Sequence, residues 1–274
     1  MTTSPFAARR AAFRKLHEQG CFLIPNPWDI GSARLLAHLG FKALATTSSG
    51  FAWSQGQPDN TMDIDQVLAN CRAIVAATDL PVNADFEDGH ASDLKELQDN
   101  VRRCIDTGIA GLSIEDATGD ASQPLYDLEE AVARLRAARS AIDASGEDVM
   151  LIARAECFLV GHDDPLNESL RRLQAYAAAG ADCLYAPGLA IPQHIQTLVK
   201  TVAPKPVNVL VGRPSPLSLQ ELADLGVRRV SVGGALAGAA WGGAMRAAQA
   251  LAEGRFDGFA DNAPHVELND LFSD

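Results

Sequence analysis

Short apolar runs alternate with longer amphipathic stretches along nearly the whole chain. Each apolar run is bounded by glycine, proline or polar turn residues, which is typical of buried strands in a parallel sheet. The pattern predicts eight strands. They lie at Cys21–Pro25, Ala43–Thr47, Pro81–Asp85, Gly111–Glu115, Met150–Arg154, Cys183–Ala186, Pro206–Val211 and Arg229–Val232.

An amphipathic stretch follows each predicted strand and indicates a helix. We expect helices at Ser32–Leu39, Asp63–Ala77, Asp93–Thr107, Leu128–Ala144, Asn167–Ala179, Ile191–Thr201, Ser218–Leu225 and Gly234–Glu253. Four of these helices end in a glycine shortly before the next strand, where a left-handed residue commonly closes a helix. These glycines are Gly40, Gly108, Gly180 and Gly226.

Eight strand–helix units in succession predict one (β/α)8 barrel, a TIM barrel, which needs about 250 residues. In a chain of 274 residues this architecture leaves Pro5–Gln19 as an extra N-terminal helix and Asp257–Asp274 as a tail. We therefore expect residues 1–274 to form a single α/β domain. A doubly wound open sheet is the alternative, but IPNPWDIGSA stands where that fold has its glycine-rich dinucleotide loop.

The composition and net charge of the chain exclude several classes of function. Hydrophobic residues make up 47% of the chain and charged residues 21%, enough for a sizeable core. The net charge of -12 has the wrong sign for binding nucleic acid or an anionic membrane, so we expect a small-molecule substrate. Five scattered cysteines without a CxxC pair, and no apolar segment of signal-peptide or membrane-span length, favour a reducing, cytoplasmic location.

Acidic residues follow two neighbouring predicted strands. PVNADFEDGH brings Asp85, Glu87 and Asp88, and LSIEDATGD brings Glu115 and Asp116. Carboxylates gathered at a barrel mouth repel one another unless a cation neutralises them. Hard oxygen donors with little histidine suit Mg²⁺ or Mn²⁺ better than zinc. The alternative is that these acids solvate a surface turn or cap the next helix.

Other strand ends add polar groups of different kinds. Arg154 ends the fifth strand and can clamp a carboxylate or pair with Glu115. ATTSSGFAW predicts a small polar loop around Ser49, whose amides and hydroxyls can hold a carboxylate. Asp59, in SQGQPDNTMD, lies on a predicted lid or caps the next helix. Asn208, in PVNVLVG, needs hydrogen-bond partners if it is buried.

The motifs NPWDIGSARL, TTSSGFA, PVNADFEDG, GLSIEDATG, LIARAE and VNVL stand in the order and spacing of the isocitrate lyase/phosphoenolpyruvate mutase superfamily. The chain resembles this superfamily from Phe22 to Gly234. The resemblance implies a TIM-barrel lyase that binds Mg²⁺ at its mouth. It also implies cleavage or formation of a bond next to a 2-oxo acid carbon, through a metal-stabilised pyruvate enolate.

The resemblance also implies roles for individual residues. Asp85 would bind the metal directly, and Glu87 and Glu115 would bind it directly or through water. The oxo-acid carboxylate and enolate oxygen would be held by five residues: Ser49, Gly50, Phe51, Arg154 and Asn208. Asp59 would lie on a mobile gating loop and would form the catalytic set with Arg154 and Glu115.

The chain departs from the superfamily at the loop after the fourth strand. EDATGDASQPLYDLEE stands where isocitrate and methylisocitrate lyases have a Lys-Lys-Cys-Gly-His loop and phosphonopyruvate enzymes a Lys-Thr-Asn-Ser segment. Glu87 and Ala155-Glu156 also replace the more common Asp and Thr-Asp. We therefore expect a decarboxylase or lyase of a small 2-oxo or 2-hydroxy dicarboxylate, with oxaloacetate as the simplest substrate. His90 and Tyr126 are candidate proton donors.

Three alternatives stay open: a methylisocitrate or isocitrate lyase with a different acid, a phosphonopyruvate enzyme acting on a P–C bond, and a non-catalytic 2-oxo acid-binding barrel. A Schiff-base aldolase is disfavoured because Lys42 and Lys205 are not at strand ends. The last predicted helix is rich in alanine and glycine. The resemblance implies that it is swapped between subunits of a homotetramer, a dimer of dimers.

Overall fold

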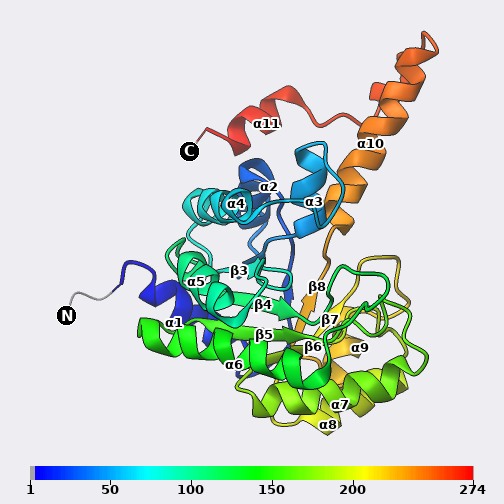
Figure 1. Cartoon of the computed structure of the whole chain (residues 1–274). Coiled ribbons are helices and arrows are strands. Elements are labelled where there is room, and N and C mark those ends of the chain that lie inside the picture. Colours follow the sequence, from blue (N-terminus) through cyan, green and yellow to red (C-terminus); the bar gives the residue numbers. More distant parts are fainter. Residues whose placement is uncertain (1–3, 274) are drawn as a thin grey trace.

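The structure, a computed structural model, describes residues 4–273. Eight parallel strands form one sheet in the order β1-β8-β7-β6-β5-β4-β3-β2. This order confirms the predicted (β/α)8 barrel (Figure 1). The strands are β1 (Phe22–Ile24), β2 (Leu44–Ala45), β3 (Val82–Asp85), β4 (Gly111–Glu115), β5 (Met150–Arg154), β6 (Cys183–Tyr185), β7 (Val207–Leu210) and β8 (Arg229–Ser231).

Asn26, just after β1, closes the barrel between its first, second and last strands. Its side-chain amide donates to the carbonyl of Thr46, at 2.9 Å, and its Oδ1 accepts from the backbone amides of Val232 and Gly233. The backbone amide of Ala45 also donates to the carbonyl of Pro25, at 3.1 Å. These bonds satisfy backbone groups at the seam between β1 and β2.

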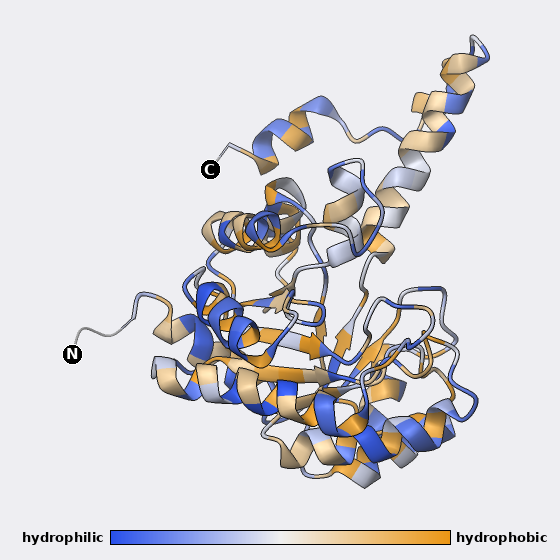
Figure 2. Ribbon diagram, in the orientation of Figure 1, coloured by the Kyte–Doolittle hydropathy of each residue, from blue (hydrophilic) through white to orange (hydrophobic). Residues whose placement is uncertain are grey.

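The helices between the strands turn their apolar sides towards the sheet, and Figure 2 shows the strands as the more hydrophobic layer. All four predicted closing glycines have a positive φ, from 84° to 104°. The helices of the barrel are α2 (Ile30–His38), α3 (Ser48–Ser54), α4 (Ile64–Ala77), α5 (Leu94–Ile105), α6 (Leu128–Ser145), α7 (Pro165–Ala178), α8 (Pro192–Val202), α9 (Leu219–Asp224) and α10 (Ala235–Ala252).

Helix α1 (Ala7–Leu16), inside the predicted Pro5–Gln19 segment, closes the amino-terminal end of the barrel. Phe13 is fully buried among the residues that fill the interior of the barrel. Gly111, the first residue of β4, makes room for it, because a Cβ there would lie 2.7 Å from the Phe13 ring. Arg10 is also buried and donates to the backbone carbonyls of Ile109 and Ile105.

Two segments differ from the sequence prediction. The predicted polar loop around Ser49 is helix α3, which begins there because the Thr47 side chain accepts a hydrogen bond from the backbone amide of Gly50. The predicted tail contains a 3-10 turn at Asp257–Phe259 and helix α11 (His265–Leu271), which contacts α2. Asp274, the end of the predicted tail, lies outside the described residues.

Helix α10 extends away from the barrel instead of lying flat on its outer surface (Figure 1). Most of its residues are exposed, among them Trp241, Met245 and Leu251. Leu23, in the middle of β1, is also 36% exposed, which is unusual for an apolar side chain of a central barrel strand. Within residues 4–273, no helix has both the length and the apolar character needed to cross a membrane.

We expect Phe13→Ala to destabilise the protein by about 3–5 kcal/mol, because it leaves a cavity in the barrel interior that its neighbours cannot fill. Chemical denaturation would measure the change. Leu94→Ala is the control, since Leu94 is 42% exposed, and it should cost less than about 1 kcal/mol. Equal losses for the two variants would contradict the role assigned to Phe13.

Candidate active site

Arg154, the last residue of β5, lies at the centre of the carboxyl-terminal mouth of the barrel. Its Nη1 donates to Oδ1 of Asp85 at 2.6 Å, and its Nη2 lies 3.0 Å from Oε2 of Glu115. Its Nε donates to Oε1 of Glu156 at 2.8 Å. The guanidinium also stands over the ring of Tyr185, 5.3 Å from its centroid. One cation thus joins three carboxylates from the ends of three adjacent strands.

The charges of this cluster are strongly coupled. Burial alone lowers the pKa of Arg154, but the carboxylates of Glu115, Glu156 and Asp85 raise it well above its ordinary value. Burial raises the pKa of Glu115 well above its ordinary value, and the charge of Arg154 opposes the shift. Burial likewise raises the pKa of Glu156. Arg154 therefore stays charged, although it cannot neutralise all the acids around it.

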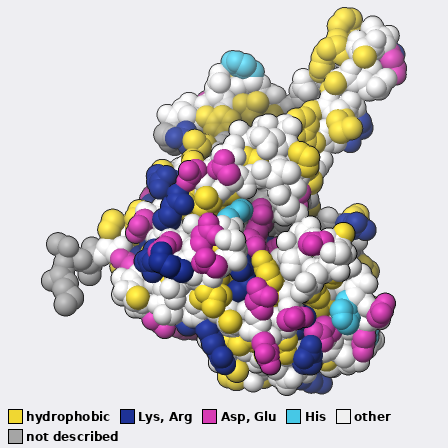
Figure 3. All heavy atoms as spheres, viewed as in Figure 1, with side chains coloured by type: hydrophobic (Ala, Val, Ile, Leu, Met, Phe, Trp, Pro, Cys, Tyr) yellow, Lys and Arg dark blue, Asp and Glu magenta, His cyan; other side chains and the backbone are white. Residues whose placement is uncertain are grey.

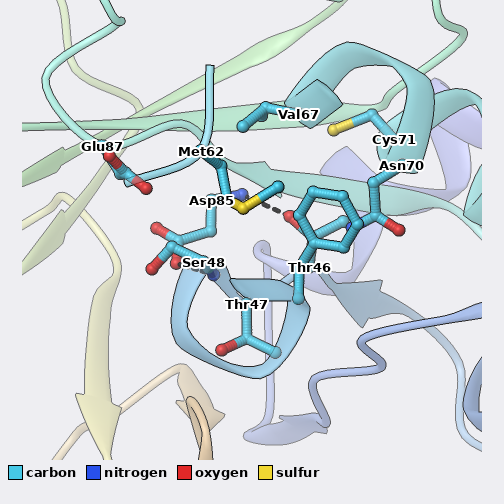
Figure 4. Close-up of a pocket in the computed structure, with 10 residues that line it drawn as sticks. Thr46, Thr47, Ser48, Met62, Val67, Asn70, Cys71, Asp85 and Glu87 are labelled. Carbon is cyan, nitrogen blue, oxygen red and sulfur yellow. Dashed lines mark hydrogen bonds between the residues drawn. The ribbon is translucent and has the colours of Figure 1, made fainter. Parts of the chain in front are cut away.

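Glu87 lies among the negative charges of three other acids, Asp85, Asp59 and Asp88. It follows β3 in a tight turn with a φ of 46° and lies close to Asp85, which also accepts from the backbone amide of Ser48 (Figure 4). Burial, then the charges of Asp85, Asp59 and Asp88, raise the pKa of Glu87 to about 8. Its carboxylate is 4.0 Å from Nδ1 of His90.

The two candidate proton donors occupy different surroundings. Burial lowers the pKa of His90, so its ring is neutral beside Glu87. The hydroxyl of Tyr126 donates to Asp88 at 3.0 Å, and burial raises the pKa of Tyr126 to about 12. Arg134 also donates to Asp88 and stacks on Tyr126. Asp88 and Tyr126 therefore fix the turn after β3 to helix α6 rather than join the cluster around Arg154.

Asp116, next to Glu115, points away from the cluster. It accepts from Arg172 and from the hydroxyl of Tyr176, both on helix α7. It also accepts from the backbone amide of Glu156, at 2.8 Å. Asp116 is 2% exposed, so these bonds satisfy a buried carboxylate and hold the end of β5 in place.

The predicted carboxylate-binding segment lies in helix α3. The Ser49 hydroxyl is 3.1 Å from that of Thr47, and Ser49 lines a cavity at the barrel mouth. Gly50 is buried, and a Cβ there would be 2.7 Å from Thr47 Cγ2. Phe51 lines a small space beside α4 that Asp85 and Glu87 also line. Of the three predicted residues, Ser49 thus lies at the mouth, Phe51 lies beside Asp85 and Glu87, and Gly50 packs against Thr47.

Asp59 lies in the segment between α3 and α4 and lines the same cavity as Ser49. Burial and the charge of Asp85 raise the pKa of Asp59, while a hydrogen bond with the Ser48 side chain lowers it. These interactions bring Asp59 together with the acids around Arg154, on the segment that the sequence predicted as a lid.

Asn208 is buried in β7, 1% exposed, and both ends of its amide are occupied. Its Nδ2 donates to the hydroxyl of Ser231, and its Oδ1 accepts from Nε of Arg229. The residue therefore belongs to a polar chain inside the barrel. That chain reaches the mouth through Tyr185, whose hydroxyl is 3.5 Å from the hydroxyl of Ser231.

Glu156 has a role that the sequence reasoning missed. It is 3% exposed and holds Nε of Arg154, so it orients the guanidinium from the side opposite the predicted metal ligands. The available signal was its position two residues after Arg154, because alternate residues of an extended segment face the same side.

The donor chemistry of the mouth suits a hard divalent cation. Asp59, Asp85, Glu87, Glu115 and Glu156 gather around the single positive charge of Arg154. Within residues 4–273, no three His, Cys, Asp or Glu side chains are arranged closely enough to hold a metal ion by themselves. Oxygen donors from two or three acids, completed by water, are the usual environment of Mg²⁺. The excess negative charge beside Glu87 therefore fits a cation bound partly through water.

A (β/α)8 barrel with charged groups at the carboxyl ends of its strands defines a class of enzymes whose active site lies at that mouth. The chain matches the profile of the phosphoenolpyruvate phosphomutase family over residues 13–252. It belongs to this family, and so to the isocitrate lyase/phosphoenolpyruvate mutase superfamily that its motifs indicated.

Relatives with known names or structures include both lyases and mutases. An oxaloacetate decarboxylase of Bradyrhizobium diazoefficiens is 30% identical, over 91% of this chain and 87% of the relative. A Burkholderia cenocepacia crystal structure, provisionally assigned as a lyase/mutase, is 46% identical with a TM-score of 0.95 and covers 98% of both chains. Oxaloacetate acetylhydrolase with oxalate is 26% identical with a TM-score of 0.87, over 98% of this chain and 95% of that one.

The raised pKa of Glu87 predicts how stability depends on pH. In the folded protein this carboxyl keeps its proton up to a pKa of about 8, against an ordinary value of 4.5. The unfolded chain loses the proton first, so the contribution to stability is full below pH 4.5 and is lost as the pH rises through 8.

We expect the metal-free wild-type protein to lose stability relative to Glu87→Gln as the pH rises over this range, because the amide does not ionise. Urea unfolding of both proteins in the presence of chelator would measure the difference, in which the titrations of groups far from Glu87 cancel. A difference that is independent of pH would show that Glu87 ionises normally.

Proposed function

We propose that this protein is a Mg²⁺-dependent carbon–carbon lyase that decarboxylates a small 2-oxo dicarboxylate such as oxaloacetate. The observation that carries the proposal is the cluster of Arg154 with Asp85 and Glu115 at the barrel mouth. Two of the relatives are named for reactions of oxaloacetate, one at 30% and one at 26% identity. Mn²⁺ could take the place of Mg²⁺ in this role. The same site would also serve the cleavage of a 2-hydroxy dicarboxylate.

Arg154 supplies the cationic donors for the substrate. A guanidinium has five N–H donors, and the contacts with Asp85, Glu115 and Glu156 use three of them. The remaining donors can hold a substrate carboxylate, with the hydroxyl of Ser49 at the edge of the same space. Because three carboxylates fix the guanidinium, little conformational entropy is lost when the substrate binds.

Asp85, with Glu87 and Glu115 directly or through water, would hold Mg²⁺, and the bound ion would polarise the 2-oxo group of the substrate. In the reaction, the bond between C3 and its carboxylate breaks and carbon dioxide leaves. The electron pair moves towards the 2-oxo oxygen, and C3 then takes a proton to give pyruvate. Asp59, on its segment at the rim, would cover the site and limit the access of water.

We expect pyruvate release from oxaloacetate that depends on Mg²⁺ and is abolished by chelator, after correction for the breakdown caused by the metal alone. Asp85→Ala and Arg154→Lys should each lower kcat/KM by at least about 100-fold, since they remove a metal ligand and the fixed guanidinium geometry. Arg154→Lys keeps the positive charge that balances the buried acids.

Asp99→Ala is the matched control, because Asp99 is an exposed acid on α5, paired with Lys95, and should leave activity unchanged. Full activity in both Asp85→Ala and Arg154→Lys would refute the placement of the site. Binding of oxalate with Mg²⁺ but no turnover of oxaloacetate, methylisocitrate, isocitrate, dimethylmalate or phosphonopyruvate would instead favour a non-catalytic binding barrel.

We also propose that the protein is a homotetramer built from dimers that exchange α10. The support is the exposed apolar surface of α10, with Trp241 46% and Met245 67% exposed, together with the exposed Leu23 of β1. Burying such surface is favourable by about 25 cal/mol per Å². The five free thiols support a reducing compartment such as the cytoplasm.

Sedimentation equilibrium is expected to give about four times the chain mass of 29.0 kDa. Met245→Glu should shift the protein towards smaller species, because it places a charge in the proposed contact. Glu253→Gln, an exposed change at the end of the same helix, should not. A monomer at all concentrations would refute the assembly.

A further inference from the structure

A cavity of about 900 Å³ lies beside the acid cluster, under the loops that follow β6, β7 and β8. Ser49, Trp53 and Asp59 line the end that it shares with the candidate active site. Because Asp59 interacts with the charges of Asp85 and Arg154, this end of the cavity adjoins the candidate active site.

Most of the cavity wall is aliphatic. Leu189, Ile195 and Leu222 are each at most 3% exposed and form part of the hydrophobic core, so the floor of the cavity rests on the packed barrel, while the loops after β6, β7 and β8 form its rim. At the rim, Leu159 is 57% exposed. An apolar ligand group would cover this leucine and so remove apolar surface from water.

Charged groups are scarce in this half of the barrel mouth. Among the described residues that line the cavity, the charged side chains are Asp59, at the active-site end, and Arg213, which is exposed on the loop after β7. The ends of β3, β4 and β5 carry the acids and Arg154, whereas the loops after β6 and β8 bring Gly188 and Gly233 to the cavity. The mouth thus has a charged half and an apolar half.

Cavities of about 300–1,000 Å³ usually hold ligands of drug size, so a four-carbon acid uses a small part of this one. We propose that the substrate is a 2-oxo dicarboxylate with an apolar chain of several carbons on C3, and that this chain lies in the cavity. The inference rests on the proposed function, because it assigns the two carboxylates and the 2-oxo group to the charged half of the mouth.

The reaction of such a substrate balances in the same way as that of oxaloacetate. The bond between C3 and its carboxylate breaks, carbon dioxide leaves, and C3 takes one proton. A 3-alkyl-2-oxosuccinate therefore gives carbon dioxide and a 2-oxo acid whose chain is longer than that of pyruvate by the alkyl group. No oxidant or reductant is needed.

A series of straight-chain 2-oxo acids, from pyruvate to 2-oxooctanoate, tests the cavity without requiring turnover. With Mg²⁺ present, we expect the dissociation constant measured by calorimetry to fall about three- to four-fold for each added methylene, until the chain fills the cavity. Constants that stay equal or rise with chain length would overturn the inference.

Ala190→Trp tests the location, because Ala190 is an exposed residue that lines the cavity and a tryptophan there would fill it. We expect a much larger loss of affinity for 2-oxooctanoate than for pyruvate. Ala144→Trp places the same side chain on the exposed face of α6, away from the cavity, and should keep the wild-type dependence on chain length. An equal effect of the two variants would contradict the assignment.

Turnover separates this inference from the proposed function. If 3-hexyl-oxaloacetate has a higher kcat/KM than oxaloacetate, both stand. If long 2-oxo acids bind tightly but neither compound is decarboxylated, the cavity assignment stands and the reaction is wrong. If oxaloacetate is decarboxylated but chain length lowers both affinity and kcat/KM, the reaction stands. In that case the cavity is not a substrate site, and a segment of a second copy of the chain becomes its occupant.

Discussion

The barrel mouth depends on one buried cation. Arg154 lies between carboxylates from β3, β4 and the segment after β5, donating hydrogen bonds to Asp85 and Glu156 and forming an ion pair with Glu115. Without that charge, Asp85, Glu115 and Glu156 would repel one another in surroundings where water screens them poorly. The carboxyl ends of three strands therefore keep their relative positions because one guanidinium fits all three acids.

A second set of ion pairs supports this cluster from outside. Asp116 binds Arg172 and Tyr176 of α7 and the backbone amide of Glu156, and so fixes the residue that holds Nε of Arg154. Asp88 does the same for the turn after β3, through Arg134. The adjacent acids Glu87 and Asp88, and likewise Glu115 and Asp116, thus have different structural roles. One of each pair faces the mouth, and its neighbour ties the strand end to a surrounding helix.

The alternation of apolar and amphipathic segments was enough to predict the barrel, because every strand–helix unit repeats the same pattern. It also predicted that Asp85, Glu87, Glu115 and Arg154 come together, since the carboxyl ends of parallel barrel strands share one face. The helix at Ser48–Ser54 was not predicted, because the residues Thr47 and Gly50 are as typical of a polar turn as of the start of a helix.

Asn208 illustrates what spacing along one strand cannot predict. In the sheet, Glu115 pairs with Arg154, Arg154 with Tyr185, Tyr185 with Asn208, and Asn208 with Arg229. Because the strands of a barrel are staggered, a row that begins at the mouth on β4 descends into the interior by β7. The position of a side chain along the barrel axis therefore depends on how all the strands from β4 to β7 pair with one another. No single sequence motif contains this information.

The charge of the whole protein affects how each half of the mouth can contribute to binding an anion. The chain carries a net charge of -12, and acidic side chains are spread over the face in Figure 3, so an anionic substrate meets a repulsive field. The attraction that binds an anionic substrate must therefore come from groups in the site itself. Arg154 provides it in the charged half, and the proposed divalent cation would add to it, although salt weakens such long-range effects. Burial of an apolar chain in the cavity, with the exposed Leu159 at its rim, does not depend on charge, so the apolar half can add affinity without increasing the repulsion among the acids.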